Sequence, residues 1–184
     1  MNLDITNFFD STFLKTKEQL GLSEHEEKQV VKSFVLEAVE QRFKLVMIRS
    51  SYITFAKKII YDNCSNVLVG TVIDFPSGNS STEIKLDEIS KAINLGADDI
   101  DVVIDYELFK KGDYVYIINQ VEECTSLCLS NNKTIKWIIE SAALSDNEII
   151  DICQLIRDVV IDNFGQNNAH NVFVKSSTGF YVSP

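Results

Sequence analysis

The sequence predicts an α/β fold made of serial β-α units. Short apolar runs rich in Val and Ile alternate with longer segments that have the periodicity of amphipathic helices. Serial units of this kind form either an open doubly wound sheet or a closed barrel. Charged residues in the middle of three expected strands favour the barrel, because a doubly wound sheet buries both strand faces under helices. We therefore expect a barrel of the TIM (β/α)8 type.

The expected barrel is incomplete, because 184 residues have room for only about six β-α units. A single domain over residues 1–184 is predicted, since no Pro/Gly/Ser-rich linker, low-complexity tract or internal repeat divides the chain. A short first strand is expected at residues 8–10. The further strands are expected at residues 44–48, 67–73, 100–104, 134–140 and 172–176.

The helices expected between these strands carry start and stop signals. Ser23 with Glu26 three residues later has the pattern of a capping box, and so has Ser145 with Glu148. Glycines stand where two of the helices should end, at Gly96 and Gly165.

Composition excludes several classes of partner. The formal net charge is −10 and the isoelectric point is near 4.6, so nucleic acid and anionic membrane surfaces, which need a surplus of Lys and Arg, are not expected partners. The first ten residues are acidic rather than basic and do not resemble a signal peptide, and no apolar run is long enough to span a bilayer. The cytoplasm is the expected compartment.

The metal-ligating residue types are few. Two histidines are available, His25 and His170, and no pair of cysteines has C-x-x-C spacing. We expect no metal site and no disulfide, and buried thiols at helical positions for Cys64, Cys124, Cys128 and Cys153.

One face of three expected strands carries charge. Side chains alternate along a strand, so Asp101, Lys136 and Lys175 lie on the face opposite to the helix-covered Val, Ile and Trp residues of their strands. The three side chains should converge inside a barrel. Two lysines and one aspartate are unbalanced in charge, which disfavours a simple structural ion pair because burying an ion costs several kcal/mol.

This convergence predicts Schiff-base chemistry. A lysine beside another cation in a partly desolvated pocket has a lowered pKa, so its neutral amine can attack a carbonyl. The nearby carboxylate would move protons as the carbinolamine becomes an imine. A structural alternative stays open on the alternation alone: the lysines reach solvent at the strand ends, and Asp101 caps a loop.

Five segments carry motifs in chain order. Residues 10–14 are D-S-T-F-L and residues 70–79 end in F-P-S-G-N. Residues 92–103 are A-I-N-L-G-A-D-D-I-D-V-V, residues 136–140 are K-W-I-I-E and residues 174–179 are V-K-S-S-T-G. In this order, and over nearly the whole chain, they resemble the deoxyribose-phosphate aldolase family of class I aldolases, which are built on a (β/α)8 barrel.

The resemblance implies a reaction and roles for individual residues. The reaction is reversible cleavage of 2-deoxyribose 5-phosphate to glyceraldehyde 3-phosphate and acetaldehyde, in deoxyribonucleotide catabolism, with no metal or organic cofactor. The expected partner is a small phosphorylated sugar or aldehyde. Lys175 stands at the imine-forming lysine and Asp101 at the proton-transfer aspartate, and Lys136 is the third expected catalytic residue. The expected substrate-binding positions are Asp10, Thr12, Thr178 and Gly179.

The chain also departs from the family pattern. The family continues past the position of Lys175 with two further β-α units, which carry a second active-site lysine and the phosphate-binding loops. Phe180 stands where the family has a lysine, and Met47 where many members have a cysteine. Three interpretations stay open: a fragment of a longer aldolase, a short paralogue without activity, or a barrel completed by another chain.

The alternative function is that of a catalytically inactive truncated barrel acting as a binding or assembly module. Unpaired strands at two open edges predict either a homo-oligomer formed through those edges or termini folded across the open side, such as residues 8–9 and 180–181. With the phosphate site unbuilt, we expect little or no cleavage of 2-deoxyribose 5-phosphate by this chain.

Overall fold

The fold is described from a computed structural model, which covers residues 5–182. Six parallel strands follow one another in chain order, β1 to β6, with helices between them. This confirms the predicted α/β fold of about six β-α units. Two compact units divide the chain: one runs to Thr71 and takes in Asn94–Asp98, and the other holds Val72–Ile93 and the chain from Asp99 onward. The single domain expected from the sequence stays a prediction.

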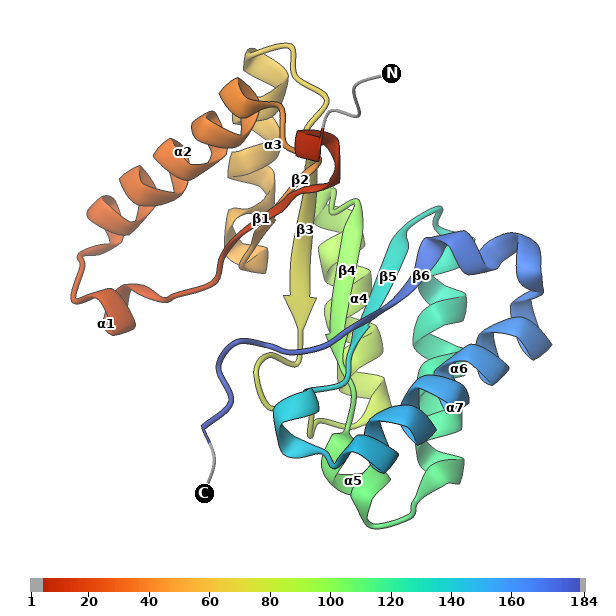
Figure 1. Cartoon of the computed structure of the whole chain (residues 1–184). Coiled ribbons are helices and arrows are strands. Elements are labelled where there is room, and N and C mark those ends of the chain that lie inside the picture. The colour runs from red at the N-terminus through yellow and green to blue at the C-terminus, as the bar shows by residue number, and fades with distance from the viewer. Residues whose placement is uncertain (1–4, 183–184) are drawn as a thin grey trace. The chain divides into compact units, whose positions relative to one another are not determined.

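The first unit contains two complete strands and most of a third. The strands are β1 (Asp10–Phe13), β2 (Leu45–Ile48) and β3 (Leu68–Ile73), and β2 pairs in parallel with both of the others. The helices are η1 (Ile5–Phe8), α1 (Lys17–Leu20), α2 (Glu24–Gln41), η2 (Ser50–Tyr52) and α3 (Ile53–Asp62). α2 packs along α3 (Figure 1). Every residue of β2 is buried, as expected for a strand paired on both sides.

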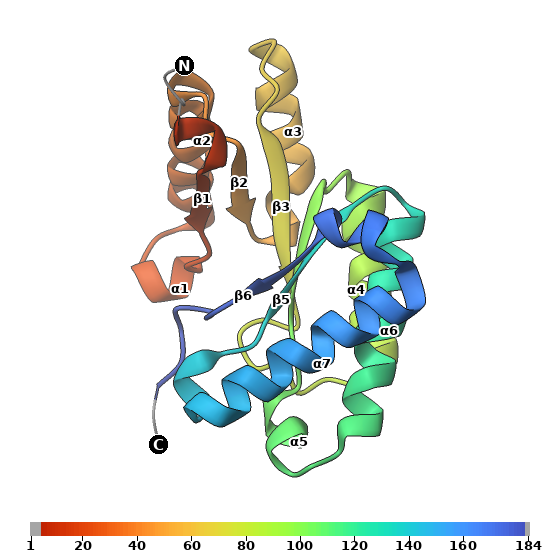
Figure 2. The ribbon, with the colours of Figure 1, turned by 45° about the vertical axis from the view of Figure 1, so that its right-hand side comes forward.

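The second unit carries the remaining strands. They are β4 (Asp99–Val103), β5 (Thr134–Ile138) and β6 (Val172–Lys175), paired in parallel with β5 in the middle. The helices are α4 (Thr82–Leu95), which ends in the first unit, α5 (Tyr106–Lys110), α6 (Tyr114–Ser130), η3 (Ser141–Ala143), α7 (Asp146–Phe164) and η4 (Gln166–Asn171). α6 and α7 pack side by side (Figure 2). The indole of Trp137 donates to the Thr125 hydroxyl on α6 at 3.2 Å, so Trp137 faces the helices as predicted.

The predicted helix signals are confirmed. Both capping boxes form. The side chain of Ser23 or Ser145 accepts from the backbone N–H of the glutamate three residues later, and that glutamate's carboxylate accepts from the backbone N–H of the serine. Gly96 follows α4 and Gly165 follows α7. A third capping box, at Thr16, was not predicted.

Two strand predictions were partly wrong. The first strand begins at Asp10 rather than ending there, because Ile5–Phe8 forms a 3-10 turn. β5 ends at Ile138 instead of continuing to residue 140, because Glu140 has a left-handed backbone (φ 50°) that a strand cannot accommodate.

The cysteines only partly follow the sequence prediction. Cys124 and Cys128 are buried on α6, and Cys153 is half-buried on α7. The prediction was wrong for Cys64, which is exposed in a left-handed turn after α3 (φ 51°). Within residues 5–182, no cluster of three or more His, Cys, Asp or Glu is arranged to bind a metal ion. No helix in that range combines the length and apolar character needed to cross a membrane.

A buried lysine fastens the loop after β3. The ammonium of Lys85, on the first turn of α4, lies 3.0 Å from an Asp74 oxygen and donates to the backbone oxygens of Gly78 at 2.8 Å and Val103 at 2.5 Å. Burial lowers the pKa of Lys85, against the attraction of Asp74. Gly78 has φ +70°, and a Cβ there would lie 2.5 Å from the Ile104 carbonyl oxygen, so the turn requires glycine.

Candidate active site

Asp101 joins two lysines from neighbouring strands of the second unit. One of its carboxylate oxygens accepts a hydrogen bond from the Lys175 ammonium on β6 at 2.7 Å, and the other accepts from Lys136 on β5 at 3.3 Å. The Asp101 side chain is fully buried, whereas that of Lys136 is 14% exposed and that of Lys175 is 31% exposed. The predicted convergence of these three side chains is confirmed.

A fourth charged residue belongs to this cluster. Asp99 lies two positions before Asp101 on β4, is 2% exposed, and accepts a hydrogen bond from Lys136. The premise of a single aspartate was therefore wrong, because Lys136 contacts Asp99 as well as Asp101. The signal was available in the sequence: residues two apart on a strand share a face, so Asp99 points the same way as Asp101.

Burial governs the protonation of Asp101. Desolvation raises the pKa of its carboxyl, and the charges of Lys136 and Lys175 oppose that rise. A carboxyl with a raised pKa, in contact with a partly exposed amine, can take up a proton from that amine and return it. The arrangement is therefore suited to acid-base work beside a nucleophilic lysine.

Glu140 holds the segment that follows Lys175. Its carboxylate accepts from the Ser177 hydroxyl at 2.8 Å, from the Thr178 backbone N–H at 3.0 Å and from the Thr178 hydroxyl. The backbone N–H of Ser141 also donates to the Ser176 oxygen at 2.7 Å. Glu140 is 1% exposed, so these bonds are buried and fix the chain immediately beyond Lys175. Sequence reasoning noted Glu140 only as part of a motif.

Two predicted substrate-binding residues lie in this segment. Thr178 is 8% exposed, and its hydroxyl donates to Glu140. Gly179 is exposed, has φ +75° and donates its N–H to the Ser177 hydroxyl at 3.0 Å. Their contact with substrate stays a prediction.

The residues after Gly179 pack over the loop that follows β3. The ring of Phe180 meets that of Phe75 edge-on, with centroids 5.1 Å apart. A pocket of about 350 Å³ lies here, lined in part by Pro76, Tyr106, Glu140 and Phe180. The folding of residues 180–181 across the open side of the barrel stays a prediction.

The other predicted substrate residues belong to the first unit. Asp10 and Thr12 lie on β1, both exposed, and the Thr12 hydroxyl is 3.5 Å from the Asp10 backbone oxygen. Their role in substrate binding stays a prediction.

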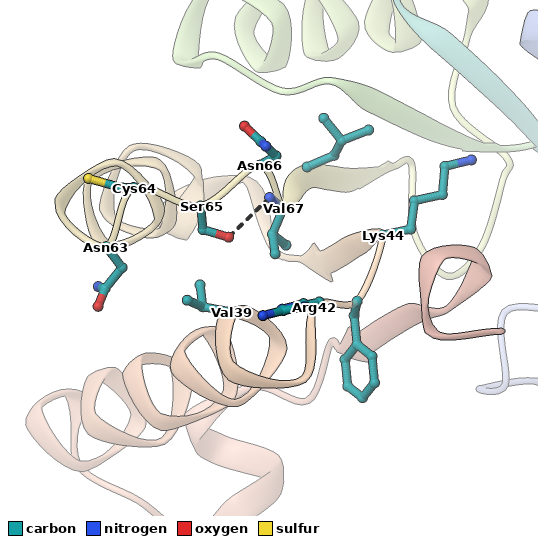
Figure 3. Close-up of a pocket in the computed structure, with 10 residues that line it drawn as sticks. Val39, Arg42, Lys44, Asn63, Cys64, Ser65, Asn66 and Val67 are labelled. Carbon is teal, nitrogen blue, oxygen red and sulfur yellow. Dashed lines mark hydrogen bonds between the residues drawn. The ribbon is translucent and has the colours of Figure 1, made fainter. Parts of the chain in front are cut away.

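A larger pocket, of about 590 Å³, lies at the amino ends of β2 and β3 in the first unit. Figure 3 shows Val39 and Arg42 on one side of it and Ser65 and Val67 on the other. Arg42 and Lys44 are its charged lining residues, and the lining includes no carboxylate. It therefore lacks the acid-base pair that the charged cluster of the second unit provides.

Comparison with known proteins identifies the family. The profile described as DeoC/LacD family aldolase matches residues 15–162. The chain belongs to this aldolase family. Deoxyribose-phosphate aldolase from Metamycoplasma hominis is 38% identical over 150 residues, which are 82% of this chain and 63% of the relative. That from Mycoplasmopsis pulmonis is 34% identical over 178 residues, 97% of this chain and 71% of the relative.

Solved structures with a similar fold include proteins named as deoxyribose-phosphate aldolases. A crystal structure from Coccidioides immitis, provisionally named deoxyribose-phosphate aldolase, superposes with a TM-score of 0.79 at 26% identity, over 97% of this chain and 62% of that one. Deoxyribose phosphate aldolase from Aeropyrum pernix superposes with a TM-score of 0.72 at 24% identity, over 97% and 66%. The predicted TIM-barrel class is confirmed, and this chain spans about two thirds of the length of these proteins.

Proposed function

We propose that this DeoC/LacD aldolase carries class I chemistry at Lys175, and that its reaction is the reversible cleavage of 2-deoxyribose 5-phosphate to glyceraldehyde 3-phosphate and acetaldehyde. The observation that carries the proposal is the 2.7 Å contact between the partly exposed Lys175 amine and the fully buried Asp101 carboxylate. The proposed setting is deoxyribonucleotide catabolism in the cytoplasm, with a small phosphorylated sugar or aldehyde as the partner.

Imine formation uses the contact directly. Lys175 passes a proton to Asp101, and the neutral amine then forms a C–N bond to the carbonyl carbon while the carbonyl oxygen takes up a proton. The C–O bond of this carbinolamine breaks and the oxygen leaves as water, protonated by Asp101, which yields the iminium. The raised pKa of Asp101 suits both transfers.

Cleavage follows from the electron-withdrawing iminium. The substrate hydroxyl loses its proton, the adjacent C–C bond breaks, and its electron pair moves to the iminium to give an enamine. Glyceraldehyde 3-phosphate leaves, a proton adds to the enamine carbon, and water releases acetaldehyde and regenerates the amine. In this scheme Lys136 stays a cation beside Asp101, and Asp10, Thr12, Thr178 and Gly179 hold the substrate.

Reductive trapping tests the nucleophile. Borohydride with acetaldehyde should leave an ethyl group on Lys175, located by peptide mass mapping, and Lys175→Ala should abolish that adduct. Lys91→Ala is the matched control, because Lys91 is an exposed lysine paired with an aspartate one helical turn away. An adduct located on Lys136 in the parent chain would show that the wrong lysine has been named.

The second candidate function is an assembly module without catalysis. β6 pairs with β5 alone among the described strands, and Phe173 and Val174 on it are 44% and 42% exposed. An unpaired strand with exposed apolar side chains favours association with a further strand. The Aeropyrum pernix aldolase is described as a tetramer. Light scattering that shows an oligomer, together with failure of the trapping experiment, would favour this function.

A further inference from the structure

Two lysines contact the same aspartate, so the structure must determine which amine reacts. Lys136 and Lys175 each donate to one oxygen of Asp101. Both come from strands next to each other in the sheet, and neither is fully buried. A nucleophilic lysine must be neutral, whereas a lysine that only supports Asp101 must keep its charge.

The strand register separates the two amines. Asp101 is level with Lys136 on β5, whereas Lys175 is level with Ile138, two residues closer to the carboxyl ends of the strands. Asp99 is level with Thr134, two residues in the opposite direction. Lys136 contacts Asp99 and is therefore drawn toward the amino ends of the strands, away from the end at which barrel enzymes bind their substrates.

We propose that Asp99 fixes Lys136 as the charged partner of Asp101 and thereby leaves Lys175 as the amine that reacts with aldehydes. Asp99 is a positioning residue in this scheme, since it acts through Lys136. The inference rests on the proposed function for the aldehyde step. Its central statement, that Asp99 suppresses the reactivity of Lys136, can be tested without any aldehyde.

The physical basis is the number of carboxylates at each amine. Asp99 and Asp101 both face Lys136 from β4, and two anions in contact with one ammonium stabilise its charged form. Among the described residues, the carboxylate paired with Lys175 is Asp101, which Lys175 shares with Lys136. Asp99 is itself buried and would be costly to leave unpaired, so its contact with Lys136 is doubly favoured.

Competitive labelling of lysines with limiting acetic anhydride at pH 8 measures this difference. Each lysine is quantified by peptide mass mapping relative to exposed Lys91, in the parent chain and in Asp99→Asn. Lys175 should label faster than Lys136 in the parent chain. In Asp99→Asn the labelling of Lys136 should rise about tenfold, because one of the two anions that stabilise its ammonium form is removed. Asp87→Asn, which removes an exposed aspartate, should leave Lys136 unchanged.

Fully buried Lys85 reports on folding within the same samples, because it should label only if the second unit opens. If Lys85 becomes labelled in Asp99→Asn, Asp99→Glu decides instead: it keeps the charge, so Lys136 should stay as protected as in the parent chain. Unchanged Lys136 labelling in a folded Asp99→Asn, or equal labelling of Lys136 in folded Asn and Glu variants, would overturn the inference.

The aldehyde step has its own readout. Borohydride trapping of acetaldehyde in Asp99→Asn should place part of the adduct on Lys136, whereas the parent chain should carry it on Lys175. If no adduct forms in the parent chain, the proposed function fails while the labelling result still stands for or against Asp99. If labelling is unaffected by Asp99→Asn but trapping occurs on Lys175, the function stands and the role of Asp99 is wrong.

Discussion

Among single residues, Glu140, two positions after the end of β5, holds the segment that follows Lys175. Glu140→Gln keeps the shape but replaces a charged acceptor of three hydrogen bonds with a neutral one that has a single acceptor oxygen. We expect a loss of about 2 kcal/mol in the free energy of unfolding, typical of hydrogen bonds to a buried charge. Urea denaturation of the parent and variant chains measures it.

Glu107→Gln is the control for this change, because Glu107 is half-exposed and its ion pair with Lys110 spans 3.7 Å on the surface of α5. It should change stability by less than about 0.5 kcal/mol. Faster amide exchange at Thr178 should accompany Glu140→Gln, since the Thr178 N–H donates to Glu140. Equal stability of the two variants would show that the hydrogen bonds of Glu140 to Ser177 and Thr178 do not stabilise the fold.

At the scale of elements, α4 is fastened to the loop after β3 and to the end of β4 through Lys85. Lys85→Met should cost about 3–5 kcal/mol of unfolding free energy, because it leaves Asp74 with an uncompensated buried charge. Asp74→Asn should also destabilise. The double variant should be less destabilised than the sum of the two single changes by about 1–3 kcal/mol. Strictly additive losses would show that the two side chains are not coupled.

Much of the element order could be predicted from the sequence, and the reasons are local. Side chains that alternate with a period of two predicted β4 and β5, and the capping boxes predicted where α2 and α7 begin. Local signals failed where a backbone conformation ends an element: the left-handed Glu140 stops β5, and the 3-10 turn before Asp10 delays β1. Neither conformation has a residue type, such as glycine or proline, that would reveal it.

The charged cluster of the candidate site could also be predicted in part from the sequence. The alternation of side chains along each strand predicted that Asp101, Lys136 and Lys175 converge, because it indicates the face of the sheet on which a side chain lies. It does not report how far a long side chain reaches along the strand. The contact of Lys136 with Asp99 therefore went unpredicted, although Asp99 has the same phase as Asp101.

Across the whole molecule, the thiols provide a test of the folded second unit, which holds Cys124, Cys128 and Cys153, and exposed Cys64 of the first unit is the reference. Burial raises the pKa of Cys124 to about 12, so at pH 8 roughly one molecule in ten thousand carries a thiolate there. Burial likewise raises the pKa values of Cys128 and Cys153. Iodoacetamide at pH 8 should therefore alkylate exposed Cys64 first, half-buried Cys153 slowly, and the two thiols of α6 only on unfolding.

Mass mapping of alkylated peptides over time measures this order, and the same reaction in urea is the control, in which all four thiols should react at similar rates. Raising the pH should accelerate reaction of buried thiols only as the pH nears their raised pKa values, because the thiolate is the reactive form. Early alkylation of Cys124 in the native chain would contradict the burial of α6 against the strands.

Imine formation and cleavage can be measured separately in the 184-residue polypeptide. Substrate phosphate is usually held by cations and by backbone N–H groups, and that remote binding energy is used to lower the barrier of the reaction. The two lysines of the described cluster are both in contact with carboxylates, and Phe180 packs on Phe75 at a position where the family has a lysine. We therefore expect acetaldehyde to be trapped on Lys175, whereas 2-deoxyribose 5-phosphate is cleaved more slowly than the roughly 1 s⁻¹ of ordinary enzymes.

A coupled assay of aldehyde release, with 2-deoxyribose beside its 5-phosphate, measures the contribution of the phosphate. We expect the ratio of the two rates to lie near one for the parent polypeptide, because Phe180 stands where the resemblance implies a lysine. Phe180→Lys supplies a cation at that position and should raise the ratio several-fold, whereas Phe180→Leu, the control for lost aromatic packing, should not. Cleavage of the 5-phosphate at about 1 s⁻¹ or faster, by a monomer whose mass is confirmed as 20.8 kDa, would show instead that these residues already form a working phosphate site.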